Sequence, residues 1–299
     1  MKTTLHSKNK HASGYDFHTL CKVYKDLEPF VFVNSYETQT IDFSNPKAVK
    51  ALNTALLFAY YHITYWEFSD QNLCPPIPGR VDYIHHLATL LSSSGIKENI
   101  QVLDVGTGAT CIYPLLGNAV YDWQFLASDV DKDSLENAQV IIDKNRLSDK
   151  IKLIFQAEVS QILKGIFNTS DKLSATMCNP PFFKSEAEAI EATTRKLKGL
   201  GKPSETLVRN FGGTSNELWY EGGEKAFLHT YLYESSFFKE QCFWFTTLVS
   251  NNDHVRSMKV SLKKLGATEV KVIQMTLGNK ISRIVAWTFL TKEQQKDWN

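Results

Sequence analysis

The sequence predicts an α/β fold with a mostly parallel seven-stranded sheet, helices on both of its faces and a C-terminal antiparallel hairpin. From residue 100 onward, short apolar segments alternate with segments of helical periodicity, which is the pattern of a doubly wound sheet. The last two apolar segments, 269–275 and 283–290, are joined by a short turn at 277–280. Strands connected by so short a turn must run antiparallel.

The expected elements follow in order along the chain. The seven strands are expected at residues 100–104, 124–128, 151–156, 173–178, 242–249, 269–275 and 283–290. Helices are expected at 81–91, 131–147, 223–239 and 253–265, where apolar residues recur at a spacing of three or four. An earlier helix should begin at Asn45-Pro46, because Asn suits the N-cap and Pro suits the first turn.

Two domains are expected. Residues 1–78 form a small N-terminal accessory domain, and residues 79–299 form a catalytic domain. The boundary is indicated by three prolines within 75–78, which block regular structure. Residues 183 to about 219 are long for a connection in a compact domain, so we interpret them as a functional lid.

Composition narrows the class of protein. The chain has 299 residues, a formal net charge of +1 and 43% hydrophobic residues, so any nucleic-acid surface must be local. An odd number of well-separated cysteines fits a reducing cytoplasm, and the longest apolar stretch, 55–66, is too short to span a bilayer. We therefore expect a soluble cytoplasmic protein. We also expect no metal site, because His85 and His86 are neighbours on an expected helix and their side chains point about a quarter turn apart. A monomer is the default expectation.

A glycine-containing loop marks the cofactor site. Gly106 and Gly108 follow Asp104 at the end of the first expected strand, but Cys111 occupies the place of a third glycine. A missing third glycine favours S-adenosylmethionine over NAD, which has a pyrophosphate for the loop to approach. A parallel sheet that ends in one antiparallel hairpin is also more typical of methyltransferases than of nicotinamide-dependent enzymes.

Three further residues are candidates for the cofactor site. Asp129 ends the second expected strand, where a carboxylate can bond both ribose hydroxyls. It could instead cap the following helix. Thr110 offers a hydroxyl, and Arg80 could pair with a cofactor carboxylate or lie simply at the surface.

The segment Asn179-Pro180-Pro181-Phe182 is the candidate catalytic site. It follows an expected buried strand and lies downstream of the glycine loop. A planar exocyclic amine is a poor nucleophile, and the Asn179 side-chain oxygen and the Pro180 carbonyl could both accept its N–H groups. Such acceptors favour the cation that develops during transfer. Phe182 offers a face for stacking a base. On its own, Asn-Pro-Pro is also an ordinary turn sequence.

With these motifs, the chain resembles the bacterial 23S rRNA adenine-N6-methyltransferases along nearly its whole length. It also resembles the catalytic half of the eukaryotic enzyme that methylates adenine in a spliceosomal small nuclear RNA. Beyond the tetrapeptide and Cys178 before it, the resemblance lies in the segments 5–9, 15–17, 42–46, 48–52, 74–76, 78–80, 82–87, 111–115, 221–224 and 284–289.

The resemblance implies a Rossmann-like fold and roles for individual residues. It implies that residues 179–182 hold the target adenine. It implies that the cofactor is lined by Arg80, Gly106, Thr110, Asp129 and Ser160. Two departures stand out: Asp129 is often Glu in relatives, and Ser7 occupies the place of a basic residue.

The expected partner is 23S rRNA or a ribosomal assembly intermediate. Two basic segments carry the candidate RNA contacts, which are Lys8, Lys10, Arg195, Lys196, Lys198 and Lys202. The second segment could equally be a solvated loop. Two other functions stay open: a protein glutamine-amide N-methyltransferase, whose target nitrogen is also planar, and a non-catalytic RNA-binding module.

Overall fold

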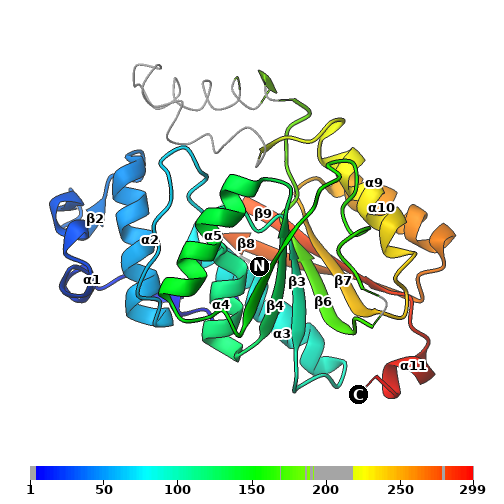
Figure 1. The fold of residues 1–299 in the computed structure, drawn as a ribbon. Helices are drawn as coiled ribbons and strands as arrows, with labels where there is room; N and C mark the ends of the chain where they lie inside the picture. The colour runs from blue at the N-terminus through cyan, green and yellow to red at the C-terminus, as the bar shows by residue number, and fades with distance from the viewer. Residues whose placement is uncertain are drawn as a thin grey trace.

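The structure is a computed structural model that describes residues 5–168, 170–185, 187–188, 191, 218–277 and 280–298. A seven-stranded sheet forms its centre, with the strand order β5-β4-β3-β6-β7-β9-β8 (Figure 1). The strands are β3 (Gln101–Val105), β4 (Gln124–Asp129), β5 (Ile151–Phe155), β6 (Leu173–Cys178), β7 (Cys242–Val249), β8 (Glu269–Leu277) and β9 (Lys280–Thr288).

The five strands β3 to β7 pair in parallel, and β9 is antiparallel to both β7 and β8. The hairpin expected at the C-terminus is therefore present. Its second strand lies between β7 and β8 rather than at the edge of the sheet. The seven expected strands are all found, and their ends differ from the expected ones by no more than three residues.

Helices cover both faces of this sheet. They are α3 (Ile77–Ser93), α4 (Ile112–Tyr121), α5 (Lys132–Lys144), α9 (Gly223–Ser235) and α10 (Asn252–Leu265). Side chains alternate along each strand, so neighbours such as Val102 and Leu103 enter two different hydrophobic clusters. One cluster packs the sheet against α3, α4 and α5, and the other packs it against α9 and α10.

The helix α4 was not expected from the sequence. It contains Pro114 and Gly117, two residues that weaken a helical pattern. The glycine is required by packing, since a Cβ there would overlap the ring of Phe125 on β4. Cys111 starts the helix with a left-handed backbone, at φ 48°.

The N-terminal segment packs against the sheet domain. Its elements are η1 (Lys10–Ser13), α1 (Phe17–Val23), η2 (Lys25–Phe30), β1 (Val31–Val33), β2 (Gln39–Ile41) and α2 (Pro46–Tyr61). As expected, α2 begins at Asn45, whose side chain accepts a hydrogen bond from the Lys47 N–H. Buried side chains from α1 and α2 belong to the same hydrophobic cluster as those from α3 and α4. The division at residue 78 stays a prediction.

The basic arm at residues 5–10 is bound to α3 rather than fully solvated. The buried Asp82 carboxylate accepts hydrogen bonds from the His6 N–H and the Asn9 side-chain amide, each at 2.8 Å. Asn9 also donates to the Pro78 carbonyl at 3.0 Å. The Lys8 and Lys10 side chains nevertheless stay exposed.

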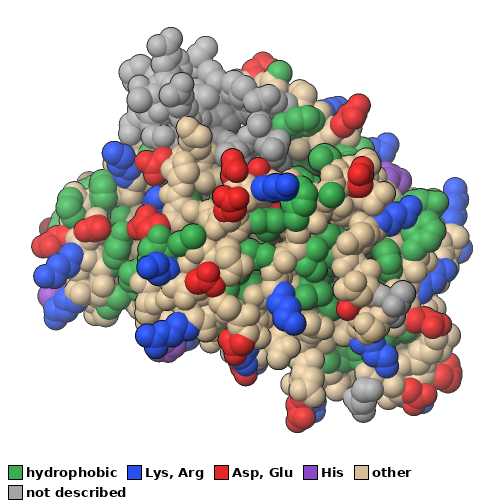
Figure 2. All heavy atoms as spheres, viewed as in Figure 1, with side chains coloured by type: hydrophobic (Ala, Val, Ile, Leu, Met, Phe, Trp, Pro, Cys, Tyr) green, Lys and Arg blue, Asp and Glu red, His purple; other side chains and the backbone are tan. Residues whose placement is uncertain are grey.

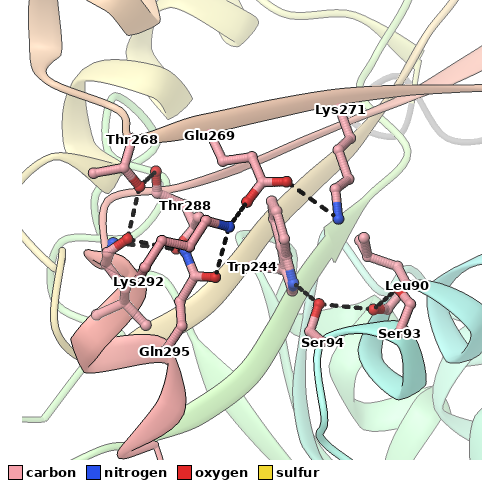
Figure 3. A network of polar contacts seen from close by, with 11 residues as sticks. Leu90, Ser93, Ser94, Trp244, Thr268, Glu269, Lys271, Thr288, Lys292 and Gln295 are labelled. Atoms are coloured by element: carbon pink, nitrogen blue, oxygen red, sulfur yellow. Dashed lines mark hydrogen bonds and ion pairs between the residues drawn. The ribbon is translucent and has the colours of Figure 1, made fainter.

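The C-terminal helix α11 (Lys292–Lys296) contacts the start of β8, a strand at one edge of the sheet. Lys292 reaches Glu269 on β8 at 2.6 Å, and Lys271 contacts the same carboxylate at 3.3 Å (Figure 3). In the same region the Trp244 indole donates to the Ser94 hydroxyl at the end of α3. No helix within the described residues is long and apolar enough to cross a membrane.

Candidate active site

A cavity of about 720 Å³ opens at the carboxyl ends of β3, β4 and β6. The chain turns in opposite directions from β3, towards β4 on one side and β6 on the other. Ligands of open α/β sheets bind at such a reversal. The glycine loop, the Asp129 region and the tetrapeptide all contribute to the wall of this one cavity.

The glycine loop is fixed by its own backbone. The N–H groups of Gly106 and Thr107 both donate to the Ser128 carbonyl, at 2.9 and 3.0 Å. Gly106 and Gly108 have φ values of +74° and +63°, a region that favours glycine. Gly106, Gly108 and Thr110 all line the cavity, and their role in cofactor binding stays a prediction.

Two side chains from other segments hold the outer end of this loop. The Trp66 indole donates to the Thr110 carbonyl at 3.0 Å, and the Asn137 amide donates to the Ala109 carbonyl at 2.8 Å. Trp66 comes from the N-terminal segment and Asn137 from α5. These contacts could not be predicted from sequence patterns, because each joins positions far apart in the chain.

Asp129 lies at the end of β4 and lines the cavity. One carboxylate oxygen accepts from the Gly108 N–H at 2.8 Å, and the other accepts from the Asp131 N–H at 3.0 Å. The helix cap that Asp129 could have provided is supplied by Asp131, whose side chain accepts from the Ser134 N–H. Burial raises the pKa of Asp129.

Asp104 occupies a different place from the other loop residues. It is fully buried and is not part of the cavity wall. Burial raises the pKa of its carboxyl to about 7, while neighbouring Thr107 and Arg80 act in the opposite direction. The geometry thus favours an indirect role behind the loop over contact with a ligand.

Arg80 lies in the cavity wall in the first turn of α3 and is only partly exposed. Its guanidinium donates to the Tyr113 hydroxyl at 2.7 Å and lies 5.3 Å from the centre of that ring. The Nε atom is buried and has no hydrogen-bond partner among the described residues. Arg80 is therefore not a simple surface residue, and its role in cofactor binding stays a prediction.

The tetrapeptide leaves the end of β6 at the edge of the cavity. Asn179 and Pro181 line the cavity, Pro180 is buried behind them, and Phe182 is 38% exposed. Phe182 is not part of the cavity wall in this structure. Its stacking role stays a prediction.

A second segment, Leu218–Tyr220, binds the last residue of the tetrapeptide and the residue after it. The N–H groups of Phe182 and Phe183 donate to the Leu218 carbonyl at 3.1 and 3.0 Å. The Tyr220 N–H donates to the Phe183 carbonyl at 3.1 Å, and Phe183 and Trp219 form a parallel bridge. Trp219 and Tyr220 both line the cavity.

The segment after β5 forms another part of the wall. It contributes Gln156 and the four residues Val159–Ile162, which include Ser160, the position implied by the family resemblance. Nothing in the residues themselves marked Ser160.

Two of the expected RNA contacts, Lys8 and Lys10, lie within the described residues. The Lys8 ammonium lies 5.7 Å from the ring centre of Tyr121, the last residue of α4. The first residue of α4 lines the cavity, so Lys8 lies beside the opposite end of this helix. Arg195, Lys196, Lys198, Lys202 and most of the expected lid lie outside the described residues.

Within the described residues, no group of three His, Cys, Asp or Glu side chains is arranged to hold a metal ion. On the face seen in Figure 2, acidic and basic side chains are interspersed. This agrees with the near-zero net charge.

Comparison with known proteins gives consistent matches. A family model described as RNA methyltransferase matches residues 1–291. The ribosomal RNA large subunit methyltransferase F of Flavobacterium psychrophilum is 48% identical, covering 99% of this chain and 97% of that protein. The protein of the same name from Shewanella loihica is 45% identical, covering 98% of this chain and 81% of that protein.

Solved structures of human METTL16 are also similar. Its catalytic domain in complex with the MAT2A 3′UTR hairpin 1 has a TM-score of 0.83 and 29% identity, and 97% of each chain is covered. Its N-terminal domain in complex with SAH has a TM-score of 0.78 and 26% identity, covering 97% of this chain and 100% of that one. The α/β methyltransferase fold predicted from the sequence is confirmed by this likeness.

Proposed function

The chain belongs to the RNA methyltransferase family, and from that premise we propose that it transfers a methyl group from S-adenosylmethionine to the N6 amine of an adenine in 23S rRNA. The curated relatives are named as methyltransferases of the large-subunit ribosomal RNA, and the human structural relatives were solved with an RNA hairpin and with SAH. The observation that carries the proposal is geometric. Asn179 and Pro181 of the tetrapeptide line the same cavity as the glycine loop.

The chemistry of the cavity wall suits S-adenosylmethionine, which supplies the methyl group when bound. Asp129 is the candidate acceptor for ribose hydroxyls, and Arg80 is the candidate partner of the carboxylate. Thr107 and Arg80 both line the cavity, so polar side chains stand beside the space that the donor would occupy. The backbone at Gly106 leaves open space, with no atom within 4 Å of where a Cβ would stand.

The tetrapeptide would orient the target amine. The Asn179 side-chain oxygen and the Pro180 carbonyl accept its two N–H groups and aim the nitrogen at the donor side of the cavity. As the nitrogen gains positive charge, these oxygens stabilise it, so alignment and electrostatics provide the acceleration. We assign no side chain as a base. The proton leaves to solvent after transfer.

The adenine would leave its stack to enter the cavity, and the exposed Phe182 would then cover one of its faces. We assign RNA contacts outside the cavity to Lys8 and Lys10 of the accessory domain 1–78, and to the lid at 183–219. A ribosomal substrate places the reaction in the cytoplasm, and the chain would act as a monomer.

The decisive experiment offers the protein three substrates with labelled S-adenosylmethionine. These are 23S rRNA from cells that lack the protein, a protein bearing exposed glutamines, and no acceptor. Nuclease digestion and mass spectrometry should find label as N6-methyladenosine in the RNA alone. Label on glutamine, or at a different position of the base, would contradict the proposal that the target is the N6 amine of adenine. RNA binding without transfer would favour a non-catalytic module.

A further inference from the structure

The wall segment 156–166, which connects β5 towards β6, ends against a buried carboxylate. Glu234, the penultimate residue of α9, is only 3% exposed. One of its oxygens, Oε2, accepts the backbone N–H groups of Ile162, Leu163 and Lys164, at 2.9, 2.6 and 3.0 Å. Three consecutive amides therefore converge on a single acceptor.

The position of Glu234 is unfavourable unless these amides are present. A carboxylate loses its hydration when it is buried, and the C-terminal end of a helix carries partial negative charge. Backbone N–H groups arranged as a concave anion site offset both costs. The carboxylate and the conformation of segment 156–166 thus stabilise each other.

Segment 156–166 makes further contacts on either side of the Glu234 carboxylate. The Gln156 side chain donates to the Lys164 carbonyl at 2.8 Å and accepts from the Glu158 N–H at 3.0 Å. Leu163 is fully buried, and the Lys164 ammonium lies 4.6 Å from the ring centre of Phe237, beyond the end of α9. The segment closes around the end of α9 at the point where Glu234 lies.

The same helix is bound to the strand that carries the tetrapeptide. The Tyr231 hydroxyl, three residues before Glu234, is hydrogen-bonded to the Thr176 hydroxyl on β6 at 2.5 Å. Thr176 lies three residues before Asn179. One helix therefore supports both the wall segment and the strand that leads to the candidate catalytic residues.

We propose that Glu234 is a positioning residue for methyl-donor binding: its carboxylate holds segment 156–166 in the conformation in which Val159–Ile162 form the cavity wall. This inference rests on the proposed function, because it takes the cavity as the donor site. Glu234 does not line the cavity, so its effect passes through the backbone of the segment.

The test uses Glu234→Gln, which keeps the shape of the side chain and removes its charge. Isothermal titration of the full-length protein with S-adenosylhomocysteine should show affinity reduced about tenfold if the wall conformation falls to roughly a tenth of the molecules. Amide hydrogen exchange without ligand should accelerate at residues 162–164. Affinity for RNA, measured without ligand, should change little.

Glu224→Gln is the matched control. Glu224 lies on the same helix, is 5% exposed and accepts the Ser250 N–H at 2.9 Å, but it binds the turn after β7 instead of the wall segment. This variant should lose thermal stability and keep both the ligand affinity and the exchange rates at 162–164. Equal loss of affinity in the two variants would overturn the proposal by showing a general structural effect.

Normal affinity in Glu234→Gln together with fast exchange at 162–164 would also overturn it, because the wall would then be dispensable. If the unmodified protein fails to bind S-adenosylhomocysteine, the donor assignment itself is wrong, and the inference falls with it. That failure is distinguishable because it appears before any substitution is made.

Discussion

The two sides of the cavity are built differently. On the donor side, the loop from Gly106 to Thr110 is bonded to the Ser128 carbonyl, to Asp129 and to side chains from two distant segments. On the target side, the tetrapeptide follows β6, and its last residue is joined through its backbone to Leu218. Thr107 is 5% exposed, whereas Phe182 is 38% exposed.

This difference matches the proposed ligands. A small cofactor is the same in every turnover and is bound best by a site formed before it arrives. An adenine in an RNA chain must enter from solvent, and exposed aromatic and backbone groups can adapt to it. The donor side should therefore tolerate little change without losing binding, and the target side should lose transfer while binding persists.

The sharpest way to separate the two sides is Asn179→Ala. We expect methyl transfer to fall by about a hundredfold to a thousandfold, because one acceptor for the developing charge is removed. Affinity for S-adenosylhomocysteine should be unchanged. The measurements are single-turnover methylation of 23S rRNA and calorimetry.

Asn251→Ala is the control for that substitution. Asn251 caps α10 away from the cavity and accepts from the Asp253 N–H. Its loss should cost about 1 kcal/mol of stability and leave the rate intact. Undiminished turnover in Asn179→Ala would remove the tetrapeptide from the mechanism.

In contrast to Asn179→Ala, Asp129→Asn should weaken binding of the donor more than it lowers the rate of transfer. The amide cannot accept the two N–H bonds and the ribose hydroxyls equally well, so affinity for S-adenosylhomocysteine should weaken by roughly thirtyfold. The rate at saturating donor should change much less. Asp133→Asn, on the exposed first turn of α5, is the matched control. A fall in the saturated rate alone would contradict the donor-side assignment.

Asp104, behind the loop on the donor side, should make the free energy of unfolding depend on pH. Burial raises the pKa of Asp104 to about 7 from an ordinary 3.8, so the folded protein retains a proton that the unfolded chain releases. Its contribution to the free energy of unfolding is therefore complete below about pH 4. The contribution declines by about 1.4 kcal/mol for each pH unit between the unfolded and the folded pKa, and it is lost as the pH passes 7.

The measurement is urea unfolding at pH 6 and pH 8. Between these values the free energy of unfolding should fall by about 1.4 kcal/mol less in Asp104→Asn than in the unmodified protein. Groups common to both proteins cancel in this difference. Identical pH dependence would mean that Asp104 is ionised in its buried position.

The smallest effect is expected from the accessory segment. Replacing Lys8 and Lys10 together by Ala should weaken RNA binding about fivefold at moderate salt and lower the salt-dependence slope by about 2, one for each phosphate that a lysine no longer neutralises. Filter binding at several salt concentrations provides the slope. Lys292→Ala, which removes a lysine paired with Glu269, should leave the slope unchanged. An unaltered slope in the double variant would mean that Lys8 and Lys10 do not contact RNA phosphates.

The sequence predicted the regular parts of the molecule because their signals are local. Alternating apolar strands and the Asn45-Pro46 cap depend on neighbours within a few residues. The helix α4 was missed because Gly117 weakens helical propensity and is explained only by the ring of Phe125 on another element. Propensity was overridden by close packing.

The same reasoning separates the predicted from the missed site residues. Gly106, Gly108 and Asp129 follow strand ends, where parallel sheets place their ligand-binding groups, and all three line the cavity. The pairing of Phe183 with Trp219 and the support from Glu234 join positions that are 36 or more residues apart. No periodicity or spacing encodes such contacts. Only the folded chain brings them together.

The place of β9 has a consequence for chains that stop early. Residues 245–249 of β7 pair with 283–287 of β9, so a product truncated before residue 280 would leave that row of peptide groups bare. Unpaired peptide N–H and C=O groups along a strand can pair with a second copy of the chain, which leads to aggregation. A stop codon just after Leu290 would remove α11 and Trp298, which packs against Phe243, but it would leave β9 paired with β7. A chain truncated before residue 280 should therefore give much less soluble protein than a chain truncated after Leu290.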